Sequence, residues 1–166
     1  MGSWPEDFLI SIVIPLPKKD NATRCSNFRN ISLIQHACKV ILRVLTQRIE
    51  GKAKDCISGS QFGFRRGVET RDAIESMRML IQRNLEYNNN MYVCFADFEK
   101  AFDRVSWPKM MTILKTIGVD WRNRGLIAEL YSRQEIIVRL DGKESEPCIV
   151  GRGMRQGCLL SPHLFS

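Results

Sequence analysis

The most informative part of the sequence reads Phe95-Ala96-Asp97-Phe98-Glu99-Lys100-Ala101-Phe102-Asp103. Residues 91–96, at its start, are rich in aromatic and β-favouring side chains, and this composition predicts a buried strand. Because side chains alternate between the two sides of a strand, Asp97 follows on the same side as Phe95. The predicted strand therefore ends by presenting a carboxylate.

Two interpretations of this carboxylate stay open on the stretch alone. A carboxylate at the end of an apolar strand is costly to bury unless a metal ion or an arginine meets it, which would make Asp97 a ligand. Aspartate is also common as a turn former or a helix cap, with no functional role. Phe102, five residues later, comes just after a turn and is placed to wall the same small space.

The composition favours a polyanionic partner. The chain has 166 residues, enough for one domain or part of a larger one, and its 25 Lys and Arg against 18 Asp and Glu give a net charge of +7. This excess indicates nucleic acid ahead of a membrane surface, although a merely basic soluble protein fits the charge as well. Without an apolar run of membrane-span length or a signal-peptide layout, we expect a protein of the nucleus or cytoplasm that is not secreted.

The cysteine pattern agrees with such a compartment. None of the six cysteines forms a C-x-x-C pair, and the two histidines lie far apart in the sequence. We therefore predict reduced, structural thiols, with a zinc site built from distant residues as the alternative.

The N-terminal part predicts a basic hairpin. Residues 8–16 have the composition of a strand, and Pro15 and Pro17 restrict that strand to the edge of a sheet. Residues 27–33 are predicted to return as its partner after a polar turn. This hairpin is either a mobile basic finger or a solvated loop, and the basic residues near its tip are Lys18, Lys19, Arg24 and Arg29.

Helical periodicity then predicts two longer helices. The first runs from a cap at Ser32 to a stop at Gly51, and the second runs from a cap at Thr70 to about Leu85. Each has an apolar stripe at helical spacing, which we expect to pack into the core.

The second half predicts two shorter helices and another hairpin. The first begins after a cap at Ser106, with Pro108 in its first turn, and the second starts at Asp120. Residues 135–140 alternate like a strand, Asp141-Gly142 is a strong hairpin turn signal, and residues 148–150 are the predicted returning strand.

Two glycine-rich segments carry polar and basic side chains. Residues 57–67 contain two aromatics and two arginines, which suit phosphate and base contacts, but they lack the spacing of a P-loop. Residues 151–157 open an apolar run that predicts a helix, in which Pro162 is expected to cause a kink or an early break.

Taken in order, four blocks resemble the reverse transcriptase of non-LTR (LINE-type) retrotransposons, and the resemblance covers nearly the whole chain. The blocks are Phe28-Arg29-Asn30-Ile31-Ser32-Leu33 at the end of the hairpin, Gln61-Phe62-Gly63-Phe64-Arg65-Arg66-Gly67 with Thr70 and Asp72-Ala73-Ile74, the stretch Phe95 to Asp103, and Arg155-Gln156-Gly157-Cys158-Leu159-Leu160-Ser161-Pro162. Each block is weak evidence alone, and their common order and spacing make the resemblance specific.

The resemblance implies a metal site and a sugar gate. Asp97 matches the first metal-binding aspartate of the polymerase palm, and the backbone carbonyl of Phe98 is expected to face a metal ion as well. Phe102 matches the aromatic residue that lies under the incoming sugar and rejects a 2′-hydroxyl. The implied cofactor is Mg²⁺, two ions in a full-length enzyme, with Mn²⁺ as a possible substitute.

The resemblance also implies contacts to the nucleotide and the template. Arg29 matches an arginine that lies over the incoming triphosphate, and Lys18 or Lys19, with Lys19 preferred, matches a second phosphate contact. Gln156 and Gly157 match residues that line the nucleotide pocket and the templating pair. The implied template contacts are Gln61, Phe64, Arg65 and Arg66.

The fold class implied is α+β, the fingers and part of the palm of a right-hand polymerase. We assign residues 1–90 to the fingers, 91–105 to the first palm strand and turn, 106–154 to a return to the fingers, and 155–166 to the start of a palm helix. The second half of the palm and the thumb are missing from this assignment, so we expect exposed apolar surface.

The function implied is that of a fragment of an RNA-directed DNA polymerase, with an RNA template, a DNA primer and a deoxynucleoside triphosphate as partners. The family needs a paired Asp-Asp after the Gln156-Gly157 block, and no such pair occurs in these 166 residues. We therefore predict that the chain alone is inactive. Two alternatives stay open: a non-catalytic, basic nucleic-acid-binding fragment, and an inert remnant of a retroelement.

Overall fold

A computed structural model describes residues 3–165, which form two units. The first unit contains residues 3–56 and Lys100–Phe165, and the second contains Ile57–Glu99. The fold is mixed, with a sheet and helices, in agreement with the α+β class predicted from the sequence.

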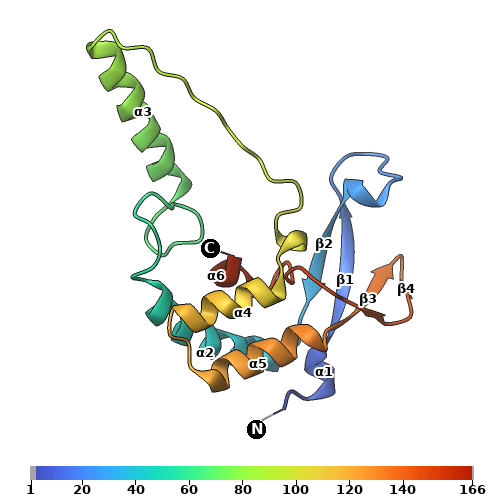
Figure 1. Ribbon diagram of the computed structural model, residues 1–166. Helices are drawn as coiled ribbons and strands as arrows, with labels where there is room; N and C mark the ends of the chain where they lie inside the picture. The colour runs from blue at the N-terminus through green and yellow to red at the C-terminus, as the bar shows by residue number, and fades with distance from the viewer. Residues whose placement is uncertain (1–2, 166) are drawn as a thin grey trace. The chain divides into compact units, whose positions relative to one another are not determined.

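The first unit contains a sheet with the strand order β2-β1-β3-β4 (Figure 1). β5 also pairs with β3. β1 and β2 form the predicted antiparallel hairpin, and β1 pairs in parallel with β3 on its other side. The strands are β1 (Ile10–Pro17), β2 (Phe28–Leu33), β3 (Glu135–Leu140), β4 (Lys143–Glu144) and β5 (Cys148–Ile149).

The prediction that β1 is an edge strand is wrong, because β1 lies between two neighbours. Its pairing with β3 covers only Ile10–Val13, whereas its pairing with β2 continues to Pro17. Pro15 and Pro17 lack a backbone N–H and therefore end the ladder on the β3 side only. The prolines limit the length of one ladder, and they do not exclude the strand from the interior of the sheet.

The predicted turn at Asp141-Gly142 is confirmed. Both residues have positive φ, at 50° and 76°, which is the backbone conformation of a type I′ hairpin turn. The chain returns from this turn along β3, first through β4 and then through β5.

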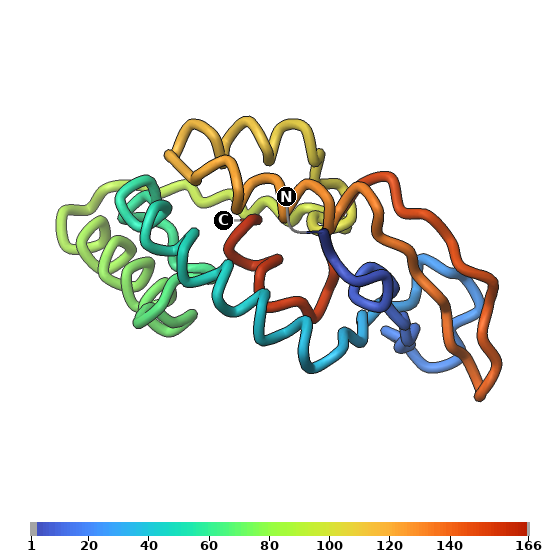
Figure 2. Tube along the Cα trace, turned by 90° about the horizontal axis from the view of Figure 1, so that it is seen from below, coloured from blue at the N-terminus to red at the C-terminus, as the bar shows by residue number. Residues whose placement is uncertain are grey.

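The helices of the first unit enclose one hydrophobic core. In Figure 2 the C-terminal segment runs between α2 on one side and α4 with α5 on the other, and buried apolar residues of all these segments form the core cluster. The helices are α1 (Glu6–Leu9), α2 (His36–Ala53), α4 (Trp107–Thr116), α5 (Trp121–Ser132) and α6 (Ser161–Phe165), with 3₁₀ turns η1 (Cys25–Asn27) and η2 (Phe102–Arg104).

The ends of two helices differ from the prediction. Ser32 belongs to β2 and is no cap, because α2 begins only at His36, and Gly51 lies inside that helix. A glycine at a helix end stops the helix when the chain turns there, and here the helical hydrogen bonds continue. Pro162 lies in the first turn of α6, where proline is tolerated, because the helix begins at Ser161 and not after Gly157.

The second unit contains one helix, α3 (Thr70–Glu86), and its apolar stripe is not core. Its N-cap is Glu69 and not Thr70, since Glu69 and Asp72 form a reciprocal capping box. None of the residues of α3 is buried, and Leu85 is 73% exposed. Helical spacing shows which face is apolar, but burial also requires a partner, and Ile74 and Ile81 of that face are 55% and 41% exposed.

The predicted buried strand over residues 91–96 is also wrong. Residues 89–98 adopt no helix or strand, and Tyr92 and Phe95 are 91% and 85% exposed. A strand forms only with a hydrogen-bonding neighbour, and the strands described in this structure pair with one another and not with this segment. The sequence composition favours a strand here, and the partner is absent from the described residues.

The buried thiol of Cys38 makes stability sensitive to alkaline pH. Burial raises the pKa of this thiol from 9.0 to about 11, against the opposing effect of nearby Arg155. The folded state therefore holds the proton longer than the unfolded state, so the free energy of unfolding should fall as pH rises from about 9 to about 11. Urea unfolding at pH 8 and pH 11 should show a smaller loss in Cys38→Ala than in the wild type. Cys25→Ala, at an exposed cysteine, should lose as much as the wild type, and equal losses in all three would contradict the prediction.

Candidate functional site

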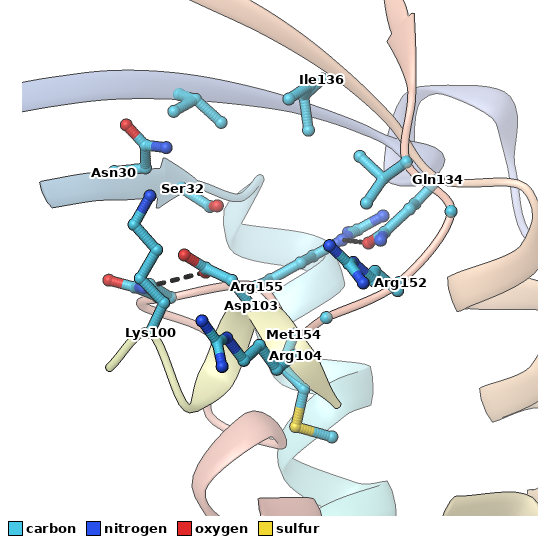
Figure 3. Close-up of a pocket in the computed structure, with 15 residues that line it drawn as sticks. Asn30, Ser32, Lys100, Asp103, Arg104, Gln134, Ile136, Arg152, Met154 and Arg155 are labelled. Atoms are coloured by element: carbon cyan, nitrogen blue, oxygen red, sulfur yellow. Dashed lines mark hydrogen bonds between the residues drawn. The ribbon is translucent and has the colours of Figure 1, made fainter. Parts of the chain in front are cut away.

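The first unit contains a pocket of about 540 Å³ beside the sheet. Its wall is built by β1, β2, the start of β3, the turn at η2 and the loop over residues 150–156. Figure 3 shows Asn30 and Ser32 of β2 on one side of this space, with Lys100, Asp103 and Arg104 across from them.

Residues 150–157, called the strap below, cross from β3 to β2 and close one side of the pocket. Backbone hydrogen bonds fix the strap at several points along its length. The amides of Val150, Gly153 and Met154 donate to the carbonyls of Gln134, Val105 and Phe102, and the carbonyl of Gln156 accepts from the amide of Ser32 at 2.8 Å. The strap is therefore held to three elements that are far apart in the sequence.

Two glycines allow the strap to lie close to its neighbours. Gly153 has a φ of 87°, and a Cβ on it would lie 2.9 Å from the backbone oxygen of Asp103. Gly157 has a φ of 96°, and a Cβ there would lie 3.1 Å from the backbone oxygen of Ser32. Both positions combine a left-handed backbone with a close approach, which only glycine accepts without strain.

Arg155 anchors the strap from within the core. Arg155 is 4% exposed, and its guanidinium donates to Gln134 Oε1 at 3.0 Å and to the carbonyls of Phe8 and Leu9 at 3.2 and 2.9 Å. Figure 3 shows the bond between Arg155 and Gln134. Burial lowers the pKa of this guanidinium, although arginine stays charged in proteins. A buried charge is tolerated here because three oxygens accept its N–H groups.

Three exposed cations and one carboxylate line the open part of the pocket. The cations are Lys100 and Arg104, on either side of Asp103 in the chain, and Arg152 of the strap. The carboxylate of Asp103 accepts a hydrogen bond from Gln156 Nε2 at 3.2 Å. The pocket thus has a net positive lining, which suits an anionic ligand.

Among the predicted site residues of this unit, Gln156 lines the pocket and Gly157 lies beside β2. Strand alternation places Arg29 on the same side of β2 as Ile31, opposite Asn30 and Ser32. Ile31 Cγ2 lies 3.8 Å from the position of a Cβ on Gly157, so Gly157 lies near a residue on the same side of the strand as Arg29.

Phe102 and the hairpin lysines have other surroundings. Phe102 is partly buried against the core and stacks on Phe165 with ring centroids 4.6 Å apart. Lys18 and Lys19 are exposed beyond the end of β1, and Lys18 Nζ donates to the carbonyl of Ser26 at 3.4 Å.

The other predicted site residues belong to the second unit. Asp97 and Phe98 are exposed in the segment without regular structure, and Phe98 is 80% exposed. Phe64, Arg65 and Arg66 are exposed in the loop before α3, where Phe64 has a φ of 57°. Gln61 is partly buried, and its Nε2 donates to the carbonyl of Gly63. Asp97 belongs to the second unit and Arg29 and Gln156 belong to the first, so a common site for the three stays a prediction.

Sequence reasoning assigned no role to several residues that shape this site. Arg155 and Asp103 stand inside the quoted blocks, and Lys100, Arg104 and Arg152 carry the positive lining. Their residue types alone give no sign of this, since a buried arginine and an exposed one look alike in a sequence. The glycine spacing of Gly151, Gly153 and Gly157 was the available signal for a tightly packed strap.

The described residues do not by themselves complete a metal site. In residues 3–165 no three or more His, Cys, Asp or Glu side chains gather so that they could hold a metal ion. Asp97 supplies a single carboxylate, whereas Mg²⁺ takes six oxygen ligands, some of them water.

None of the helices in residues 3–165 combines the length and the apolar character that a membrane span requires.

Comparison with known proteins places this chain in a polymerase family. A family model described as reverse transcriptase (RNA-dependent DNA polymerase) matches residues 16–166. The Xenopus laevis protein described as transposon TX1 uncharacterized 149 kDa protein is 26% identical over 99% of this chain and 13% of its own length. The Drosophila funebris RNA-directed DNA polymerase from mobile element jockey is 27% identical over 94% of the chain and 17% of its own length.

A third relative is the Popillia japonica Pol polyprotein from type-1 retrotransposable element R2, 26% identical over 91% of this chain and 21% of its own length. The chain thus spans between about an eighth and a fifth of the length of these relatives. The resemblance to LINE-type reverse transcriptases, predicted from the four sequence blocks, is confirmed.

Proposed function

Since the chain belongs to the reverse transcriptase (RNA-dependent DNA polymerase) family, we propose that it forms the nucleotide-holding part of an RNA-directed DNA polymerase of a LINE-type retrotransposon. The observation that carries this proposal is the pocket of the first unit, which combines Gln156 with Lys100, Arg104 and Arg152. A triphosphate carries several negative charges, and polymerisation requires cations that neutralise them.

The remaining roles follow the family pattern. In that pattern Arg29 and Lys19 contact the triphosphate, Phe102 lies under the sugar, and the loop with Arg65 and Arg66 follows the template. Arg29 and Phe102 do not line the pocket, so these two roles require contacts beyond it. The first unit then belongs mainly to the fingers, and the segment with Asp97 belongs to the palm.

Asp97 and the carbonyl of Phe98 would hold Mg²⁺ together with ligands from a longer protein. When bound, Mg²⁺ stabilises negative charge on the reacting phosphoryl oxygens. The residues of this chain are too few to complete such a site, so we derive no catalytic step through the metal. We propose that the chain alone extends no primer, because a single carboxylate cannot hold two metal ions.

Nucleotide binding tests the proposal directly. Isothermal titration of dGTP into the chain, with Mg²⁺ and an RNA template annealed to a DNA primer that calls for dGTP, should show saturable binding. Gln156→Ala and Arg152→Ala should each weaken that binding about three- to tenfold, because each removes one polar or charged contact. Arg139→Ala is the matched control, since Arg139 is paired with Glu144 in the β3 hairpin and does not line the pocket.

The possible results separate the alternatives. Binding of the primed template that weakens with salt, without any dGTP binding, would favour a non-catalytic nucleic-acid-binding fragment. The absence of both would leave an inert remnant. If the wild type, Gln156→Ala and Arg152→Ala bound dGTP with equal affinity, the nucleotide would bind outside this pocket.

A further inference from the structure

The hydrogen bond between Asp103 and Gln156 connects two parts of the chain that are each fixed independently. Asp103 lies in η2, its amide donates to the carbonyl of Lys100 at 3.0 Å, and Gly153 packs against its backbone. Gln156 is held through its own carbonyl by Ser32 and through its neighbour Arg155 by the core. The backbones of Asp103 and Gln156 are therefore held in place without this side-chain bond. The bond itself orients the side-chain amide of Gln156.

The chemistry of the two groups determines that direction. An ionised carboxylate accepts hydrogen bonds and donates none, so only the Nε2 end of the Gln156 amide can face Asp103. Nε2 keeps a second N–H, and the Oε1 end is turned away from the carboxylate. We infer that Asp103 is a positioning residue, which holds the Gln156 amide so that Oε1 and the second N–H are presented to a nucleotide in the pocket. This inference rests on the proposed function and adds to it the residue that orients the recognition group.

Because the pocket is positively charged, the direction in which an Asp103 substitution changes nucleotide affinity distinguishes a positioning role from a purely electrostatic one. Asp103 is a carboxylate among Lys100, Arg104 and Arg152, and it opposes the binding of an anion through space. If Asp103 acted only as a charge, removing it would tighten the binding of a triphosphate. If Asp103 positions Gln156, removing it frees the amide to rotate and weakens the binding instead.

The experiment compares three variants in the same dGTP titration with Mg²⁺ and primed template. Asp103→Ala should weaken dGTP binding about threefold to tenfold, the range expected for one hydrogen bond. Asp103→Asn, which keeps an oxygen that can accept from Nε2 and removes the charge, should retain wild-type affinity or exceed it. Glu146→Ala removes one exposed carboxylate of the same unit outside the pocket and should bind like the wild type.

A double-mutant cycle shows whether Asp103 acts through Gln156. In the Gln156→Ala background, Asp103→Ala should weaken binding no further, because the side chain that it orients is already absent. Unchanged melting temperatures of the single variants would exclude a general loss of structure. Further weakening of dGTP binding by Asp103→Ala in that background would overturn the inference, whereas tighter binding is the effect expected from removing the carboxylate.

An observation without nucleotide tests the bond itself. The two side-chain N–H resonances of Gln156 in ¹⁵N-edited spectra should move toward the values of an exposed glutamine in Asp103→Ala and stay near their wild-type values in Asp103→Asn. Tighter dGTP binding by Asp103→Ala, or unmoved Gln156 resonances, would refute the positioning role while the proposed function stands. Absence of dGTP binding by the wild type would remove the proposed function, and the positioning role with it.

Discussion

Replacing Arg155 by alanine should lower the free energy of unfolding by about 3–5 kcal/mol, the largest effect we expect from one substitution in this chain. The guanidinium is buried and donates to Gln134 Oε1 and to the carbonyls of Phe8 and Leu9. Its removal leaves these buried acceptors without a donor, at a cost of about 1–3 kcal/mol each where water does not enter. Urea unfolding followed by circular dichroism measures the change.

Two further variants make this result specific. Arg152→Ala removes an exposed arginine of the same strap and should change the free energy of unfolding by less than about 0.5 kcal/mol. Arg155→Lys keeps the charge but cannot reach three acceptors in a fixed fork, so it should fall between the wild type and Arg155→Ala. If Arg155→Ala were as stable as Arg152→Ala, the contacts of Arg155 would not be needed to hold the strap, and the prediction would be wrong.

The second large effect is expected for Gly153→Ala, at about 2–4 kcal/mol. The substitution places a methyl group 2.9 Å from the backbone oxygen of Asp103 and imposes a side chain on a φ of 87°. The strap cannot easily move away from Asp103, because the amide and the carbonyl of Gly153 are both hydrogen-bonded. The amide donates to Val105, and the carbonyl accepts from Trp107 Nε1 at 2.7 Å.

Gly151→Ala provides the matched control two residues away. A Cβ on Gly151 has no atom within 4 Å, and its backbone is not left-handed, so this variant should be as stable as the wild type. Thermal unfolding compares the two variants, and tryptophan fluorescence should shift only in Gly153→Ala, where the bond to Trp107 is disturbed. Equal melting temperatures for both alanine variants would show that the strap moves freely away from η2.

Local signals in the sequence predicted much of the first unit. The prediction of the turn at Asp141-Gly142 was correct because these residue types favour the positive φ that the turn requires. The start of α5 was predicted correctly because Asp120 accepts hydrogen bonds from the amides of Arg122 and Asn123, and these bonds fix the first turn of the helix. In each case the determining interaction lies within a few residues, where sequence reasoning is strongest.

The failures concern partners that are distant in the sequence. The stripe of α3 and residues 91–96 have the composition of buried elements, but apolar spacing does not show whether a neighbour exists to cover them. The burial of Arg155 depends on carbonyls near the other end of the chain, and no local pattern reports it. The family resemblance supplied the roles of Gln156 and Arg29, which composition and periodicity do not provide.

The parallel pairing of Ile10 with Glu135 has a consequence for synthesis on the ribosome. The β1–β2 hairpin is made before its second neighbour, β3, which follows only after residues 34–134 have been translated. Closing so long a loop slows folding, and until then one edge of β1 is unpaired and available to other chains. Nascent chains that stall before β3 should therefore depend on chaperones, whereas those that have passed the β3 hairpin should not.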